Sequence, residues 1–81
     1  MSKNENNEDN LHYSRFVLTP KQKEVLKHLA KGLQNKEIAA EMGLSVSTVK
    51  LHISGILFRF DVHTRTAAVI KAQKQGLIDK L

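Results

Sequence analysis

The sequence predicts an all-α fold, a four-helix bundle-like domain that contains a helix-turn-helix. Apolar residues recur at three- and four-residue steps in four segments, and no segment has the strict alternation of a useful strand. Hydroxyl residues precede three of these segments and glycines follow three, as helix caps require. The chain has 81 residues, enough for one small domain.

The first helix is predicted to begin at Thr19-Pro20 and to end at Gly32. Thr19 is a good N-cap, Pro20 suits the first helical position, and Gln22 completes a capping-box pattern. Gly32 can terminate the helix in the left-handed conformation. The apolar stripe that would face the core consists of Val25, Leu26, Leu29 and Ala30.

Residues 35–42 and 46–60 read as two helices joined by a turn at Gly43, with Ser45 as the cap of the second. Ala39, Gly43 and Val49 have the spacing of a helix-turn-helix: a small contact residue, a left-handed turn and a β-branched residue that locks the two helices together. The expected core positions are Ile38, Ala39, Met42, Val49, Ile53, Ile56, Leu57 and Phe60. Such a unit presents one helix to the major groove of DNA.

The last helix is predicted from a cap at Thr64 to about Gln75, with Gly76 as its stop. Residues 1–12 are acidic and Asn-rich, and we expect a disordered tail there, with the folded domain over 13–81. The net charge of +5 divides unevenly, with −2 in residues 1–12 and +7 in residues 13–81. A basic small domain favours a polyanionic partner, most often nucleic acid.

Several classes of protein are disfavoured by the composition. The chain has no cysteine, which excludes disulfides and thiolate zinc sites. No apolar run has the length of a membrane span, and residues 1–10 lack the apolar core of a signal peptide, so we expect a cytoplasmic protein. No catalytic constellation or phosphate-binding glycine loop is present, and we predict neither an enzyme nor a cofactor. Glu24 and His28 are four apart, but without a third ligand they indicate an ion pair rather than a metal site.

Residues 18–78 resemble the DNA-binding domain of LuxR-type regulators, also called the GerE or NarL/FixJ type. The residues that carry the resemblance are Leu18-Thr19-Pro20-Lys21, Glu24-Val25-Leu26, Gly32, Asn35-Lys36-Glu37-Ile38-Ala39, Thr48-Val49-Lys50, His52, Val62 and Thr64-Arg65-Thr66-Ala67. The resemblance implies that the third helix enters the major groove and that the fourth forms a two-fold dimer contact, so that two domains read an inverted repeat. Family members usually carry an upstream receiver or sensor domain. From the resemblance we expect a short stand-alone member without such a domain.

Five positions depart from the usual family pattern. Gln22 stands in place of Glu, Gln34 in place of Ser or Thr, Gly55 in place of Asn, Phe60 in place of Leu, and Phe58 in place of a basic residue. Gly55 inside a helix costs about 1 kcal/mol relative to Ala and would permit a close approach to a backbone or a bend. Phe58 could pack on residues 13–18 or mark a dimer or partner surface.

Resemblance and helix geometry together give the candidate contacts. The base-edge candidates are Lys50, Leu51 and Ser54. Lysine can donate hydrogen bonds to guanine, leucine can contact a thymine methyl group, and serine can donate or accept a hydrogen bond. The phosphate candidates are Lys36, Ser47, Thr48, His52, Arg65 and Thr66. The candidate dimer interface, implied by the resemblance, is Ala67, Ile70, Lys71 and Lys74.

The predicted function is a sequence-specific transcription regulator that binds double-stranded DNA as a homodimer. A contact with RNA polymerase or a larger regulator is kept open. The alternative is an adaptor or antagonist that heterodimerises with a larger LuxR-type regulator through its last helix. A third interpretation, the promoter-binding domain of a sigma factor, is disfavoured by the Thr64-Arg65-Thr66-Ala67 start of a fourth helix.

Overall fold

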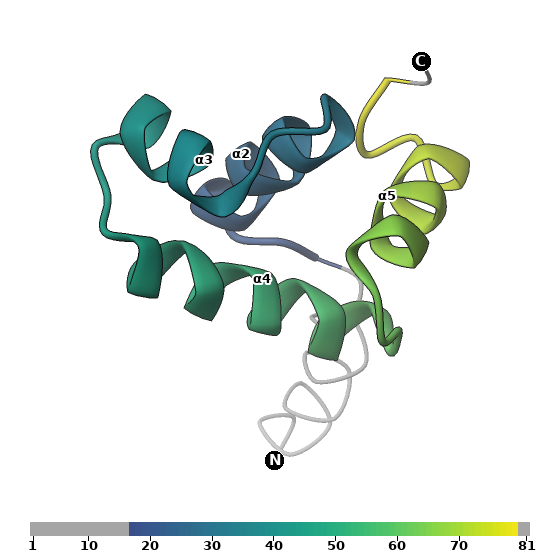
Figure 1. The fold of residues 1–81 in the computed structure, drawn as a ribbon. Coiled ribbons are helices and arrows are strands. Elements are labelled where there is room, and N and C mark those ends of the chain that lie inside the picture. Colours follow the sequence, from purple (N-terminus) through teal and green to yellow (C-terminus); the bar gives the residue numbers. More distant parts are fainter. Residues whose placement is uncertain (1–16, 80–81) are drawn as a thin grey trace, which may run out of the picture.

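The computed structural model describes residues 17–79, and these fold into four helices (Figure 1). In the labels of that figure they are α2 (Pro20–Ala30), α3 (Asn35–Met42), α4 (Val46–Phe60) and α5 (Arg65–Lys74). Residues 17–79 contain no strand, which confirms the all-α prediction for that range. The tail predicted over residues 1–12 lies outside the described residues, as do 13–16 and 80–81.

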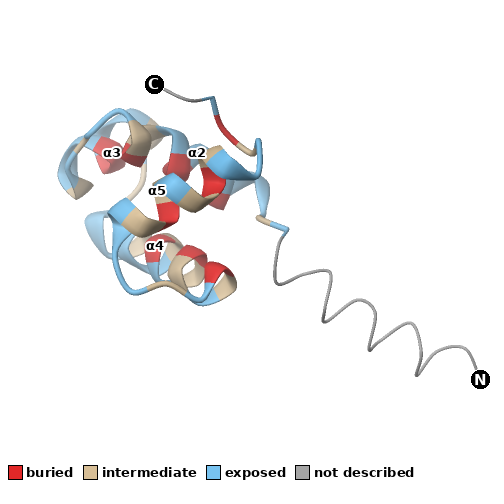
Figure 2. Cartoon of the chain, turned by 90° about the vertical axis from the view of Figure 1, so that its right-hand side faces the viewer, coloured by how far each residue is buried: buried red, intermediate tan, exposed pale blue. Residues whose placement is uncertain are grey.

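Helix α4 is the element against which the others assemble. It packs on α2, α3 and α5, while α2 also contacts α3 and α5. In Figure 1, α4 runs beneath α2 and α3, and α5 closes one end. Figure 2 shows that every helix contributes buried positions to the interior. The largest fully buried side chains are Phe60, Leu26, Ile38, Ile56, Val25 and Val49, each of which stabilises the fold by roughly 1.5–3 kcal/mol relative to exposure.

The helix ends have the capping chemistry that the sequence predicts. The Thr19 hydroxyl accepts from the Gln22 N–H at 3.0 Å, and the Gln22 side chain accepts from the Thr19 N–H at 3.0 Å. Ser45 and Thr64 cap α4 and α5 in the same way, each through a hydroxyl that accepts an N–H at 3.0 Å. Gly43 has φ of 66°, so the turn between α3 and α4 uses the left-handed conformation that glycine adopts without strain.

Gln22 and Gly55, two of the departures from the family pattern, meet in the interface between α2 and α4. Gln22 is a buried polar residue, only 8% exposed. A Cβ atom at position 55 would lie 2.6 Å from the Gln22 amide nitrogen, which is shorter than the contacts that Cβ atoms make in proteins. The close approach at Gly55 is therefore to a side chain of α2 and not to the backbone that the sequence analysis expected.

Two contacts tie the carboxyl end of α4 to its surroundings. The ammonium of Lys71 donates to the carbonyl of Phe60 at 2.8 Å, which joins α5 to the end of α4. The guanidinium of Arg59 donates to the carbonyl of Val17 at 3.1 Å, which holds the start of the described chain beside the same end. None of the helices within residues 17–79 is both long enough and apolar enough to cross a bilayer.

Candidate nucleic-acid interface

The outer face of α4, defined as Ser47, Lys50, Leu51, Ser54 and Phe58, is directed away from the core. Burial of Val49, Ile53, Ile56 and Phe60 on one side of the helix leaves these five residues on the other. All five are exposed, with Leu51 72% exposed. The three predicted base contacts, Lys50, Leu51 and Ser54, therefore share one accessible surface near the start and middle of the helix.

The first turn of α4 combines hydroxyl groups with free backbone N–H groups. Ser45 Oγ donates to Thr48 Oγ1 at 2.9 Å, and the Thr48 N–H donates back to Ser45 Oγ at 3.0 Å. The Thr48 hydroxyl thus acts as an acceptor within the cap and keeps its own proton for a further acceptor. Ser47 is exposed beside it. A helix N-terminus of this kind favours an anion, because its N–H groups and dipole carry partial positive charge.

Lys36 is exposed in the first turn of α3, close to the cap of that helix. The N-cap residue is Gln34, whose backbone N–H donates to the carboxylate of Glu37 at 2.7 Å. Glu37 therefore caps the helix from inside its first turn, where a Ser or Thr cap is usual in the family. The Lys36 side chain beside it is exposed.

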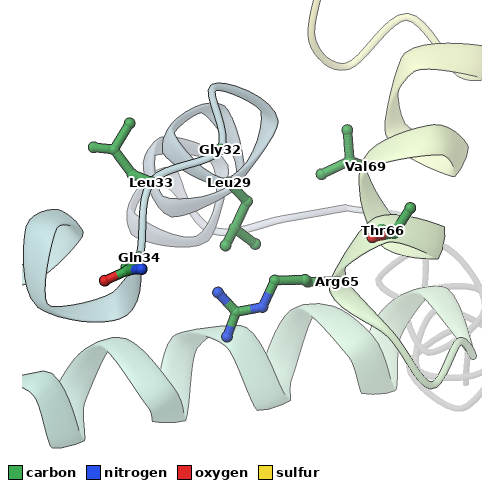
Figure 3. A pocket seen from close by; sticks show the side chains of 7 residues that line it. All are labelled: Leu29, Gly32, Leu33, Gln34, Arg65, Thr66 and Val69. Carbon is green, nitrogen blue, oxygen red and sulfur yellow. The ribbon is translucent and has the colours of Figure 1, made fainter.

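A hollow separates the start of α5 from the connection between α2 and α3. It has a volume of about 360 Å³ and is lined by Leu29, Gly32, Leu33, Gln34, Arg65, Thr66 and Val69. In Figure 3 the guanidinium of Arg65 extends from α5 into this space, in the direction of Gln34. The structure thus brings Arg65 and Thr66 close to the N-terminus of α3, on which Lys36 lies, and not onto the outer face of α4.

His52 is half-buried on α4, between the core and the outer face. This position leaves part of the His52 side chain accessible. His28 is also half-buried, and its Nδ1 atom is buried without a hydrogen-bond partner. Within residues 17–79 no three side chains of the His, Cys, Asp or Glu type gather as metal ligands would.

The candidate dimer residues lie along one side of α5, at steps of three, one and three residues. Ile70 is 47% exposed and Lys74 is exposed, whereas Ala67 and Lys71 are half-buried. The Lys71 ammonium is held by the Phe60 carbonyl, so this side chain already has a role within one domain. Ile70 is the principal apolar group that the helix offers to a partner.

Two features of the site were not anticipated from the sequence. The hollow depends on how α5 meets the connection between α2 and α3, and no local pattern encodes that contact. The bond from Arg59 to Val17 joins positions 42 residues apart. The position of Phe58 on the outer face was accessible to sequence reasoning, because it follows Leu51 by two helical turns.

Comparison with known families decides what this arrangement belongs to. The sequence profile of GerE, described as bacterial regulatory proteins of the luxR family, matches residues 16–72. The chain belongs to the luxR family. The family assignment made from the quoted motifs is confirmed.

Similar proteins include response regulators of staphylococci. The response regulator protein VraR of Staphylococcus aureus is 44% identical over 62 residues, which cover 76% of this chain and 30% of that protein. VraR of Staphylococcus epidermidis and of Staphylococcus saprophyticus match with the same identity and coverage. Among solved structures, the response regulator ChrA of a heme-sensing two-component system aligns with a TM-score of 0.74 and 39% identity, over 76% of this chain and 31% of that one.

These matches place residues 16–72 in a class of helix-turn-helix DNA-binding regulators rather than of enzymes. The chain spans about 30% of the length of the curated relatives that it matches. The family therefore establishes the type of domain. The residues with which this chain would bind DNA are inferred from its own exposed surface.

Proposed function

We propose that this protein is a sequence-specific transcription regulator that inserts the outer face of α4 into the major groove of double-stranded DNA. Lys50, Leu51 and Ser54 read base edges in this proposal. We also propose that two copies associate through α5 and read an inverted repeat, and that the protein acts in the cytoplasm.

The observation that carries the proposal is the exposure of Leu51. Leu51 is 72% exposed and lies between a lysine and a histidine on a packed helix. Its side chain therefore adds almost no buried apolar area to the core. In the major groove the same side chain can meet the methyl group of thymine, and Lys50 beside it can donate to guanine O6 and N7. Because α4 contacts all three other helices, these side chains are carried on a rigid support.

Phosphate contacts supply most of the affinity in such an interface and set the register of the protein on the duplex. The first turn of α4 offers Ser47 and Thr48 with the N-terminal N–H groups, and the first turn of α3 offers Lys36. Arg65 and Thr66 border the hollow next to the α3 N-terminus. His52, half-buried on α4, is the sixth proposed contact.

The proposed dimer contact rests on α5. Ile70 is exposed, and with Ala67, Lys71 and Lys74 it shares the side of the helix that would meet a second copy. Sedimentation of the protein with and without DNA measures this association. A 2:1 complex on an inverted repeat supports the proposal. A strict monomer that binds no DNA at low salt and associates with a larger regulator would instead favour the adaptor function.

The test of α4 is the double substitution Lys50→Ala with Leu51→Ala. Each lost base contact should cost about 1–3 kcal/mol against the preferred site, while affinity for unrelated duplexes should fall much less. Fluorescence anisotropy with a duplex selected from random sequences, and with a scrambled duplex of equal length, measures both affinities.

Lys27→Ala is the matched control, because it removes the same charge from an exposed position on α2. It should leave the ratio of the two affinities unchanged. If the double variant keeps the full preference of the original protein while circular dichroism shows an intact fold, α4 does not read the bases.

A further inference from the structure

Phe58 and Leu51 form an exposed apolar stripe on the outer face of α4. Phe58 is 84% exposed and Leu51 is 72% exposed, the two highest values among the large apolar side chains of residues 17–79. They are seven residues apart, which places them on the same side of the helix about 10 Å apart. The stripe lies on the side of α4 opposite its buried residues Val49, Ile53, Ile56 and Phe60. Base reading near the start of the helix accounts for Leu51 but not for Phe58 at its far end.

The path of the chain points to what covers Phe58. Arg59, its neighbour, donates to the carbonyl of Val17 at 3.1 Å. Residues 1–16 therefore join the domain beside the carboxyl end of α4. The bond to Arg59 therefore fixes Val17 at the end of α4 that carries Phe58.

The composition of residues 1–16 complements the outer face of α4. The segment contains three large apolar residues, Leu11, Tyr13 and Phe16, close to the junction. Its carboxylates, Glu5, Glu8 and Asp9, lie further from the junction and outnumber its cations, Lys3 and Arg15. Helix α4 contains no acidic residue, and its two cations are Lys50 and Arg59. Counted back from Val17, the apolar residues of the segment come first and the acidic residues later. Counted back from Arg59 along α4, Phe58 comes first and Lys50 later.

The lengths of the two elements are compatible. Asp9 precedes Val17 by eight residues, which reach up to about 25 Å when extended. Lys50 is nine residues from Arg59 along α4, or about 13 Å. The carboxylates can therefore reach Lys50 with the apolar residues next to Phe58.

We propose that residues 1–16 dock along the outer face of α4, with their aromatic residues on Phe58 and their carboxylates near Lys50. The consequence for DNA rests on the function proposed above: the segment and the duplex compete for one surface. Exposed ion pairs are weak and are screened by salt, so DNA can displace the segment.

A nitroxide label on the segment tests the docking without DNA. The chain has no cysteine, so Asn7→Cys gives a single attachment point in the full-length protein. Paramagnetic broadening should be strong for the amides of Leu51, Ser54 and Phe58 and weak for those of Lys31 and Lys74. Uniform or absent broadening would overturn the proposal. So would broadening that persists when labelled protein is mixed with isotope-enriched unlabelled protein, because the occupant would then be a second copy.

Substitutions in the labelled full-length chain separate the two components of the contact. Phe58→Ser and the triple change Glu5→Gln, Glu8→Gln and Asp9→Asn should each remove the selective broadening. Glu24→Gln, which neutralises an exposed carboxylate on α2, should not. Selective broadening that survives both test variants would contradict docking through Phe58 and the carboxylates.

DNA affinity reports the competition separately. At low salt the triple change should raise affinity for a duplex several-fold, and the gain should shrink as salt rises. The same change on a Phe58→Ser background should give little further gain. An equal gain in both backgrounds would show an effect of net charge alone and overturn the competition. A protein that binds no duplex would reject the proposed function and leave the label experiment as an independent test of docking.

Discussion

Leu51 and Gly55, one turn apart on α4, show how neighbouring positions of one helix serve different purposes. Leu51 is exposed and contributes no packing to the core, so its side chain is available to a ligand. Gly55 has no side chain and therefore leaves room for the buried Gln22 amide of α2. A residue with a side chain at position 55 would have to displace that amide from the cap of α2, where its oxygen accepts the Thr19 N–H.

This contact predicts a measurable coupling between positions 22 and 55. Gly55→Ala alone should realise little of the gain of about 1 kcal/mol expected from helix propensity, because the new methyl group displaces Gln22. In a Gln22→Ala background the gain should appear. The expected coupling is about 0.5–1.5 kcal/mol, the value of the cap hydrogen bond, measured by urea unfolding of all four proteins. Additive effects would contradict the contact.

At the scale of elements, the helices could be predicted closely because their ends are encoded locally. Thr19, Ser45 and Thr64 each precede a helix and cap it, and Gly43 takes the left-handed turn. The alternation of buried and exposed residues along α4 follows from its period, so the outer face was predictable as well. Contacts between distant elements were not, because no short-range pattern encodes them. The hollow that Arg65 of α5 shares with Gln34 is the clearest case.

The tie between α4 and α5 predicts a role for Lys71 within a single domain. Lys71→Met keeps the aliphatic stem but removes the donor to the Phe60 carbonyl, and should lower the free energy of unfolding by about 1–3 kcal/mol. Lys74→Met, at an exposed position of the same helix, should change it by less than about 0.5 kcal/mol. Urea unfolding at several protein concentrations separates this effect from dimerisation. Equal stability of the two variants would mean that the Lys71 bond contributes nothing.

At the scale of the whole molecule, the net positive charge and the exposed face of α4 are two separate features of the proposed DNA interface. In the proposed function, the basic balance of residues 13–81 would attract the duplex without regard to sequence, whereas the outer face of α4 would discriminate between sequences. The N-termini of α3 and α4 would set the position of the domain on the phosphate backbone. Affinity and specificity should therefore respond to different substitutions.

Lys36→Ala should weaken binding to preferred and scrambled duplexes by the same factor. It should also reduce the slope of log affinity against log salt by about one per bound domain, because one phosphate contact is lost. Titrations at four or more salt concentrations measure both effects. A loss confined to the preferred duplex would instead assign Lys36 to base recognition.

The central claim, that the outer face of α4 occupies the major groove, is tested most directly by methylation interference on a selected duplex. Guanine N7 lies in the major groove and adenine N3 in the minor groove. Methylation of guanine N7 within the site should block binding, methylation of adenine N3 should not, and Lys50→Ala should lose the effect at one guanine per half-site. Interference confined to adenine N3, or none at any guanine, would contradict the account.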